Sequence, residues 1–391
     1  MNTKNADLSH AERKAKNFRL CKYLSIAVLV LFLLGGLILY ENDITVENLR
    51  YLIQYLDFSS SGGLNEQTVI RYDADDSNRF YVFRGDLAVT NHSGITLYDR
   101  RGTAIMTDSF GMSNPVCITS DRYLAVYDLG GNQIRIYNSF TVLYEKTFDY
   151  PILSASLNED GYLCVVTSEK SYHSAVLVYD RDFNEIHRWL STDKYVMDAQ
   201  LDDDGVLTIA AVRALNGSLQ SELIVLKLGN KDPLFSYSFR DQIPLAISPS
   251  EEECWVLTDS QLKAVKNGEE QRQVSISKET LKMKCFGENY CALVQNELSV
   301  GVSFLLRVFD RQAAEVYSEQ ISLHIRDLKI FDDRIYLLMP HQLCVIPING
   351  EKQIYSLEKE YRSLAVVSKD RVLLCGENEA RVEILDQTVS S

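Results

Sequence analysis

Short apolar segments that end in an acidic or amide residue recur about every forty residues along the chain. Between them lie further segments in which β-branched and aromatic residues alternate with polar ones, separated by turns rich in Gly, Asn and Asp. This pattern predicts units of four short antiparallel strands. A single four-stranded sheet cannot bury both of its faces, whereas a ring of such sheets can, so the period predicts an all-β protein with a β-propeller fold. The clear copies end at Asp99, Asn138, Asp180, Asp310 and Asp386, and weaker ones end at Gly229, Asn267 and Asn349.

The number of blades follows from how the two ends of the repeated region match. Eight inner hairpins are visible, and the last unit stops after its third strand. Thr68–Tyr72 is a spare strand ahead of the first complete unit, so we expect it to supply the missing outer strand and close an eight-bladed ring. Seven blades is the alternative, should the irregular fourth unit not form a blade of its own. In the second unit the expected strands are Pro115–Thr119, Tyr123–Tyr127, Ile134–Tyr137 and Leu143–Phe148.

An uncharged apolar run occupies residues 23–40. As a helix it would span roughly 27 Å at about 1.5 Å per residue, which is enough for the core of a bilayer. The basic residues before it predict a cytoplasmic N-terminal tail and an extracytoplasmic body. A cleaved signal peptide is the alternative, but the run is long for one, and Glu41-Asn42-Asp43 follows it in place of an A-x-A site. The expected divisions are a basic cytoplasmic tail (1–22), a transmembrane helix (23–40), a connecting region (41–67) and the propeller (68–391).

The connecting region should hold a short helix and a linker. Leu49, Leu52, Ile53 and Leu56 lie at helical spacing, which predicts an amphipathic helix over residues 45–58. The Ser- and Gly-rich residues 59–63 after it are typical of a flexible linker.

Ring closure also predicts an orientation. If the strands of a blade are named A to D outward from the ring axis, the A–B and C–D turns share one face, and the B–C and D–A connections share the other. The closing strand is a D strand, so the chain reaches the ring on the face of the A–B turns. We expect that face to look toward the membrane, and the face of the B–C hairpins, here called the distal face, to point away from it.

Charge excludes one class of partner. The formal net charge is −14, and beyond residue 40 the chain keeps 34 of its 40 basic and 52 of its 54 acidic residues, a net of −18. A body this acidic repels polyphosphate, and no basic stripe interrupts it, so we expect no nucleic-acid binding.

Side chains suited to catalysis follow no known motif. The chain has no G-x-S-x-G, S-x-x-K, H-E-x-x-H or phosphate-binding loop, so we expect no enzyme activity, no cofactor and no metal. His92, His173 and His341 fall in or beside B–C hairpins of different blades, as solvated histidines do.

Carboxylates gather in the expected A–B turns, where tight turns favour Asp, although weak cation binding is an alternative. They are Glu159-Asp160, Asp202–Asp204, Glu251–Glu253, Asp332-Asp333 and Asp370.

Cysteine usage argues against a disulfide framework. Cys21 lies beside the apolar run, and the other seven are scattered along expected strands without a C-x-x-C pair. Only Cys285 and Cys291 are close in sequence, on strands that flank one short turn. The sequence leaves open whether these two pair or are small core residues like the rest.

Three B–C connections are unusually long, at residues 168–174, 213–221 and 295–301. Extra length in one class of loop indicates either a contact surface or a tolerated insertion. If it is a contact surface, it lies on the distal face, and the candidate residues are Tyr172, His173, Leu215, Asn216, Leu219, Leu298 and Val300.

The tail, the single anchor, the stretch ITVENLRYL at residues 44–52 and the repeated β body together resemble an uncharacterised family of membrane-anchored proteins from clostridia-like Gram-positive bacteria. The repeats resemble WD40-like and quinoprotein-like propellers only loosely, since the G-H…W-D pattern is missing and Trp189 and Trp255 are the only tryptophans. The resemblance implies an envelope location and a propeller fold, and it brings no known activity or site residues.

We therefore expect a single-pass membrane protein whose propeller is a non-catalytic protein-interaction platform or sensor. Its partners would be an envelope protein and, through residues 23–40, the lipid bilayer. The alternatives are a propeller that binds a saccharide or peptide at its central channel, or a glycan-processing enzyme. Paired carboxylates at the channel mouth would favour the enzyme, aromatic residues there the sugar binder, and exposed apolar surface on the B–C hairpins the platform.

Overall fold

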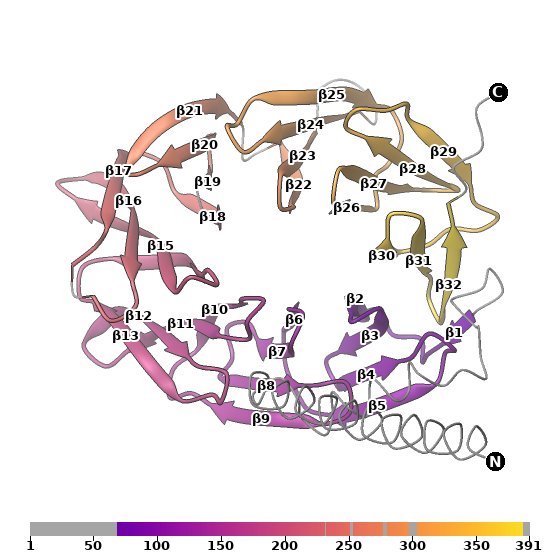
Figure 1. Cartoon of the computed structure of the whole chain (residues 1–391), viewed down its shortest axis with the longest axis horizontal. Coiled ribbons are helices and arrows are strands. Elements are labelled where there is room, and N and C mark those ends of the chain that lie inside the picture. Colours follow the sequence, from indigo (N-terminus) through magenta and orange to yellow (C-terminus); the bar gives the residue numbers. More distant parts are fainter. Residues whose placement is uncertain (1–68, 231, 251–252, 277–279, 297–302, 386–391) are drawn as a thin grey trace, which may run out of the picture. The chain divides into compact units, whose positions relative to one another are not determined.

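The computed structural model describes residues 69–385, with gaps at 231, 251–252, 277–279 and 297–302. Within these residues, strands β1 to β32 form eight four-stranded antiparallel sheets that follow one another around a ring (Figure 1). Blades one to four are β2 (Arg79–Phe83), β3 (Asp86–Asn91), β4 (Gly94–Tyr98) and β5 (Ala104–Ser109); β6 (Pro115–Thr119), β7 (Leu124–Asp128), β8 (Gln133–Tyr137) and β9 (Val142–Thr147); β10 (Ile152–Leu157), β11 (Leu163–Glu169), β12 (Tyr172–Tyr179) and β13 (Glu185–Ser191); and β14 (Tyr195–Leu201), β15 (Val206–Leu215), β16 (Ser218–Lys227) and β17 (Phe235–Arg240). Blades five to eight are β18 (Pro244–Pro249), β19 (Cys254–Thr258), β20 (Gln261–Lys266) and β21 (Glu269–Ser275); β22 (Leu281–Phe286), β23 (Tyr290–Asn296), β24 (Phe304–Asp310) and β25 (Glu315–Ile321); β26 (Asp327–Phe331), β27 (Arg334–Met339), β28 (Gln342–Pro347) and β29 (Gln353–Ser356); and β30 (Ser363–Ser368), β31 (Arg371–Cys375), β32 (Glu379–Ile384) and β1 (Val69–Arg71).

The ring closes as the sequence predicts. Strand β1 is the outer strand of blade eight and pairs antiparallel with β32, with Ile70 opposite Ala380. The Ile70 side chain is buried, and the Tyr72 hydroxyl donates a hydrogen bond of 3.1 Å to the Gly376 carbonyl. A Cβ on Gly102, in the C–D turn of blade one, would lie 3.2 Å from the Val69 carbonyl oxygen, so this turn packs tightly on the closing strand. Eight blades are confirmed, and the seven-blade alternative is wrong because the fourth unit forms a regular sheet.

The core consists of the layers between neighbouring blades. In β12, Val176 and Val178 belong to the apolar cluster between blades three and four, whereas Leu177 and Tyr179 belong to the cluster between blades two and three. Successive side chains of a strand point to opposite faces of the sheet, and both faces are covered. This is why the middle strands read as continuous apolar runs and not as a simple alternation.

The repeated acidic strand ending is a turn-forming device. The Asp180 carboxylate, at the start of a C–D turn, accepts hydrogen bonds from the backbone N–H groups of Asp182 (3.0 Å) and Asn184 (2.8 Å). These bonds hold the turn in a shape in which Phe183 has a positive φ of 61°. Asp99 caps the backbone of blade one in the same way, and Asp310 that of blade six.

Cys285 and Cys291 do not pair, which settles the question that the sequence left open. Cys285 lies opposite Ala292 and Cys291 lies opposite Phe286, so the two thiols point to opposite faces of the sheet of blade six. Cys291 belongs to the core shared with blade five, and Cys285 packs against the core shared with blade seven. All seven cysteines of the described residues are free thiols.

The segments expected before the propeller lie outside the described residues. They are the tail (1–22), the transmembrane helix (23–40) and the amphipathic helix and linker (41–67). In the part of the chain that the structure does describe, no helix has the length and apolar character needed to cross a bilayer.

Candidate functional site

The B–C hairpin of blade four is the longest in the described propeller. The sequence predicts a loop at residues 213–221, and this is wrong. The two strands stay paired as far as Leu215 and Ser218, and a two-residue turn joins them. Asn216 and Gly217 form that turn with φ values of 52° and 81°, the positive pair that a type I′ hairpin requires. The extra residues therefore lengthen two strands and leave no loose loop.

This hairpin projects beyond its own sheet. Pairing with the inner strand β14 ends at Val212, opposite Tyr195, and pairing with the outer strand β17 ends at Gln220, opposite Arg240. Residues 213–220, here called the blade-four finger, thus end in a two-stranded ribbon (Figure 1). Its two leucines are exposed, Leu215 to 47% and Leu219 to 37%.

Side chains brace the base of the finger. The Arg213 guanidinium forms an ion pair with Asp193 at 2.7 Å and donates hydrogen bonds to the Gln220 side-chain oxygen at 2.9 and 3.1 Å. Asp193 lies in the connection between blades three and four, so its ion pair with Arg213 holds the base of the finger against that connection. The exposed leucines are therefore held on a fixed element.

The candidate residues of blade three lie next to blade four. Here too the predicted loop at residues 168–174 is wrong, because Glu169 and Tyr172 remain paired around a two-residue turn. Tyr172 and His173 are both exposed, and the His173 ring stacks on Tyr195 with 4.5 Å between ring centroids. The third candidate hairpin, with Leu298 and Val300, lies outside the described residues.

Tyr195 is a surface residue that the sequence did not single out. It is 52% exposed and begins strand β14 on the distal face. An exposed tyrosine at the start of an inner strand is the signal that could have found it. The other two hairpin histidines have local partners, since His92 lies 3.1 Å from the Met112 carbonyl oxygen and His341 lies 3.4 Å from a Glu360 carboxylate oxygen.

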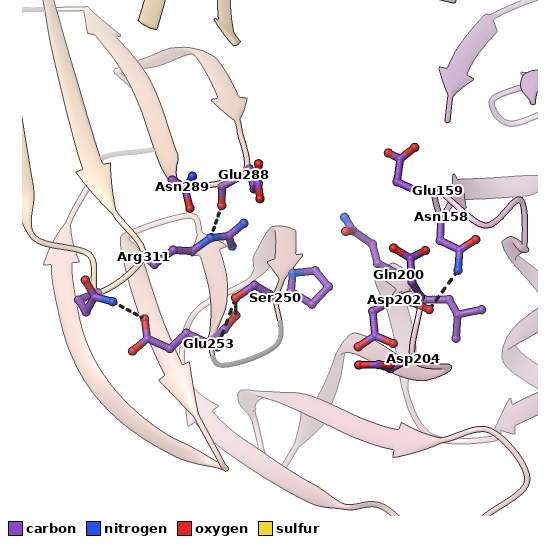
Figure 2. Close-up of a pocket in the computed structure, with 14 residues that line it drawn as sticks. Asn158, Glu159, Gln200, Asp202, Asp204, Ser250, Glu253, Glu288, Asn289 and Arg311 are labelled. Carbon is purple, nitrogen blue, oxygen red and sulfur yellow. Dashed lines mark hydrogen bonds between the residues drawn. The ribbon is translucent and has the colours of Figure 1, made fainter. Parts of the chain in front are cut away.

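On the opposite face, the A–B turns surround a cavity of about 1000 Å³ (Figure 2). Asp202 and Asp204 line one side of it, and Glu253, Glu288 and Arg311 line the other (Figure 2). The structure thus joins the predicted acidic turns of blades three, four and five, while Asp332, Asp333 and Asp370 lie elsewhere. The residues that line the cavity are Asn158, Glu159, Gln200, Leu201, Asp202, Asp203, Asp204, Pro249, Ser250, Glu253, Glu288, Asn289, Arg311 and Gln312.

The cavity is electrostatically negative. Of the described residues that line it, six are carboxylic acids and Arg311 is the single base. Burial raises the pKa of Glu159, and the charges of Asp121 and Asp203 add to that rise. Burial likewise raises the pKa of Asp202, with a contribution from Asp204. A positive charge in the cavity would relieve this repulsion.

Arg311 is committed to the fold. Its guanidinium donates to the carbonyl oxygens of Ser248 (3.0 Å) and Glu288 (2.5 Å) and lies 4.0 Å from the ring centroid of Trp255. These contacts join blades five and six, and burial lowers the pKa of the guanidinium. Within the described residues, no group of three or more His, Cys, Asp and Glu side chains is placed to hold a metal ion.

Eight four-stranded sheets, closed by a strand from the opposite end of the repeated region, define an eight-bladed β-propeller. The chain belongs to DUF5711, a family of unknown function, whose sequence profile matches residues 64–383. Membership of a family of unknown function is as the sequence predicts, whereas the membrane anchor and the Gram-positive source stay predictions.

Several solved structures have a similar fold. Saccharomyces cerevisiae Sqt1 has a TM-score of 0.60 at 9% identity, covering 82% of this chain and 99% of that one. The Dos1 propeller has a TM-score of 0.56 at 7% identity, covering 83% and 96%. BamB from Moraxella catarrhalis has a TM-score of 0.52 at 9% identity, covering 81% and 98%. No curated protein matches the chain in sequence. At these identities the likeness establishes the fold alone.

Proposed function

We propose that the protein is a non-catalytic docking platform of the cell envelope, anchored by residues 23–40 with its propeller outside the membrane. Its partner is an envelope protein that contacts the distal face over blades three and four. The observation that carries this proposal is the blade-four finger, a braced ribbon that presents Leu215 and Leu219 to solvent beyond the end of its sheet.

Apolar exposure at this place favours a contact surface over a tolerated insertion. Covering an exposed leucine side chain gains on the order of 1 kcal/mol or more, and a braced ribbon loses little conformational entropy on binding. The exposed Tyr172, His173 and Tyr195 extend the surface. A stable protein interface covers roughly 800 Å² on each partner, so the finger and this aromatic group would be used together.

The direction of the chain supports a partner away from the membrane. Strand β1 is a D strand that starts on the face of the A–B turns, and the blade-four finger is a B–C hairpin on the distal face. An anchor ahead of residue 68 would approach the face of the A–B turns and leave the finger on the distal face free to bind a partner.

In-cell photo-crosslinking tests the proposal, with a photoreactive residue at Tyr172 or Leu215 and a control at Asp203 on the A–B face. We expect one protein to be captured from both distal positions and not from Asp203. No protein adduct, or equal labelling from the two faces, would refute distal docking.

A second candidate function is ligand binding at the channel mouth, favoured by the acidic cavity of about 1000 Å³. None of the described residues that line this cavity is aromatic, which argues against a stacked sugar, and the carboxylates on both walls favour a cationic ligand or a basic peptide. Thermal unfolding with and without a tetralysine peptide tests this. Ligand binding at this cavity predicts that the peptide stabilises the protein, that Asp202→Asn and Asp204→Asn each reduce this stabilisation, and that Asp232→Asn on the exposed surface does not. No stabilisation by the peptide would refute it.

A further inference from the structure

A small cavity of about 140 Å³ lies against the blade-four finger. Leu215, Leu219, Gln220 and Arg240 line it. The pairs Leu215–Ser218, Arg213–Gln220 and Gln220–Arg240 place the Leu215, Gln220 and Arg240 side chains on one face of the ribbon, whereas Leu219, opposite Ala214, points to the other face. Arg240 is the last residue of the outer strand β17, so the cavity lies where the finger rises beyond that strand. The remaining lining residues are Asn216 and Ser218.

Arg240 differs from the other arginine of this hairpin. Arg213 is bound to Asp193 and Gln220, whereas the exposed Arg240 side chain makes no hydrogen bond or ion pair with any of the described residues, its neighbour Asp241 included. Among the described residues, the Arg240 guanidinium therefore braces no part of the fold. An arginine without a partner among the described residues, on the same face as the exposed Leu215, is complementary to a carboxylate that is flanked by an apolar side chain.

We propose that this cavity binds a carboxylate of the partner protein that is flanked by an apolar side chain. The apolar side chain covers Leu215, and the carboxylate forms a two-pronged ion pair with Arg240 on the same face, with the Gln220 amide N–H as a further hydrogen-bond donor. This inference rests on the proposed docking function and names the chemistry that the distal face recognises. A C-terminal carboxylate and an Asp or Glu side chain are the two sources of this group.

Selectivity follows from the surrounding charge. The propeller is acidic as a whole, so a strongly acidic partner segment would be repelled at long range. A single carboxylate next to an apolar residue gains the contact with Arg240 and suffers less of that repulsion. Lysine at position 240 would keep the charge but lose the planar, two-pronged geometry.

The test measures the adduct formed in cells from a photoreactive residue at Tyr172, which lies outside this cavity. We expect Arg240→Gln to lower the adduct yield about tenfold or more, because a charge-assisted contact is lost. Arg240→Lys should recover part of it. Arg272→Gln is the matched control, since Arg272 is an exposed arginine on the outer strand of blade five.

The two proposals fail in different ways. A normal adduct yield in Arg240→Gln would overturn this inference and leave the docking function standing, whereas no adduct in the unmodified protein would overturn the docking function itself.

A second experiment identifies the source of the carboxylate. The crosslinked partner segment is made as a synthetic peptide and titrated into the full-length chain. If the peptide with a free C-terminal carboxylate binds about tenfold more tightly than the same peptide with a C-terminal amide, the bound carboxylate is the C-terminus. If instead Asp→Asn or Glu→Gln in the peptide weakens binding by the same factor, the bound carboxylate is that side chain. Equal binding by all these forms would overturn the carboxylate assignment.

Discussion

Asp198 in the inner strand of blade four accepts a hydrogen bond of 3.0 Å from the backbone N–H of Ile247 in the inner strand of blade five. Gln200, two residues on, donates to the carbonyl oxygen of the same residue at 2.8 Å. The inner strand of a blade has one edge that pairs with no other strand of its sheet. Here the Asp198 and Gln200 side chains form hydrogen bonds with the backbone of the next inner strand, where a paired strand would otherwise form them. Asp327 does the same for blade eight, accepting from the Leu364 N–H at 2.9 Å.

We expect Asp198→Ala to lower the free energy of unfolding by about 1–3 kcal/mol, because it leaves the Ile247 N–H without a partner. Asp198→Asn keeps an acceptor of the same shape and should cost less. Burial raises the pKa of Asp198, so the neutral amide also avoids a buried charge. Urea unfolding of the purified protein measures both variants, and an equal loss for the two would show that the hydrogen bond is not what matters.

The buried carboxyl group of Asp86 should make the stability of the protein depend on pH. This side chain is 6% exposed, and burial raises the pKa of its carboxyl from 3.8 to about 7, against the opposing charge of Arg100. Between these values the folded protein holds a proton that the unfolded chain has released, so the free energy of unfolding falls as pH rises from about 4 to 7. The slope from this group is at most about 1.4 kcal/mol per pH unit. Asp86→Asn should remove that part of the slope, and Asp232→Asn, at an exposed site, should not.

Ring closure depends on the buried side chain of Ile70. We expect Ile70→Ala to lower the free energy of unfolding by about 2–5 kcal/mol, as other truncations of buried isoleucine do. Ile354 on the outer strand of blade seven is 58% exposed, and Ile354→Ala should change stability by no more than about 0.5 kcal/mol. Fluorescence of the buried Trp255 during denaturation reports both. Comparable losses would mean that β1 contributes little to closing the ring.

The turn of the blade-four finger requires a positive φ at Gly217, and no atom lies within 4 Å of the position that a Cβ would take. Gly217→Ala should therefore cost about 1–2 kcal/mol through backbone strain alone. Only the finger should loosen, which hydrogen exchange of the Leu215 and Ser218 amides would detect. Protection of blades distant from the finger should stay unchanged.

The cysteines of the propeller should remain reduced and slow to react. Burial raises the pKa of the Cys291 and Cys375 thiols, which lowers the fraction of reactive thiolate. We expect thiol titration to detect these groups only after denaturation, and reductant to leave the melting temperature unchanged. A disulfide between Cys285 and Cys291 in a peptide map would contradict the register of their hairpin.

Local patterns were sufficient for the blades. Each blade is a chain of neighbouring hairpins, so its strands are predicted from alternation and turn residues alone, and the strands expected in unit two agree with β6 to β9 to about one residue. Thr68–Tyr72 was recognisable as the closing strand because the last unit lacks a partner for it. The finger was misread as a loop because Arg213, Asn216 and Ser218 are polar. A ribbon exposed on both faces needs no apolar alternation, and Asn216-Gly217 was the signal of a hairpin that this polarity concealed.

The sequence by itself determined the repeat, the blade number, the closure and the face on which each turn lies, because these depend on neighbours along the chain. Only the tertiary structure decided which side chains of different blades meet. His173 stacks on Tyr195 across two blades, and Asp202 shares a cavity with Arg311 from blade six. Such contacts depend on the angle and spacing between packed sheets, which no local pattern encodes. For Cys285 and Cys291, the register of one hairpin decided the outcome, since a shift of one residue moves a side chain to the other face of the sheet.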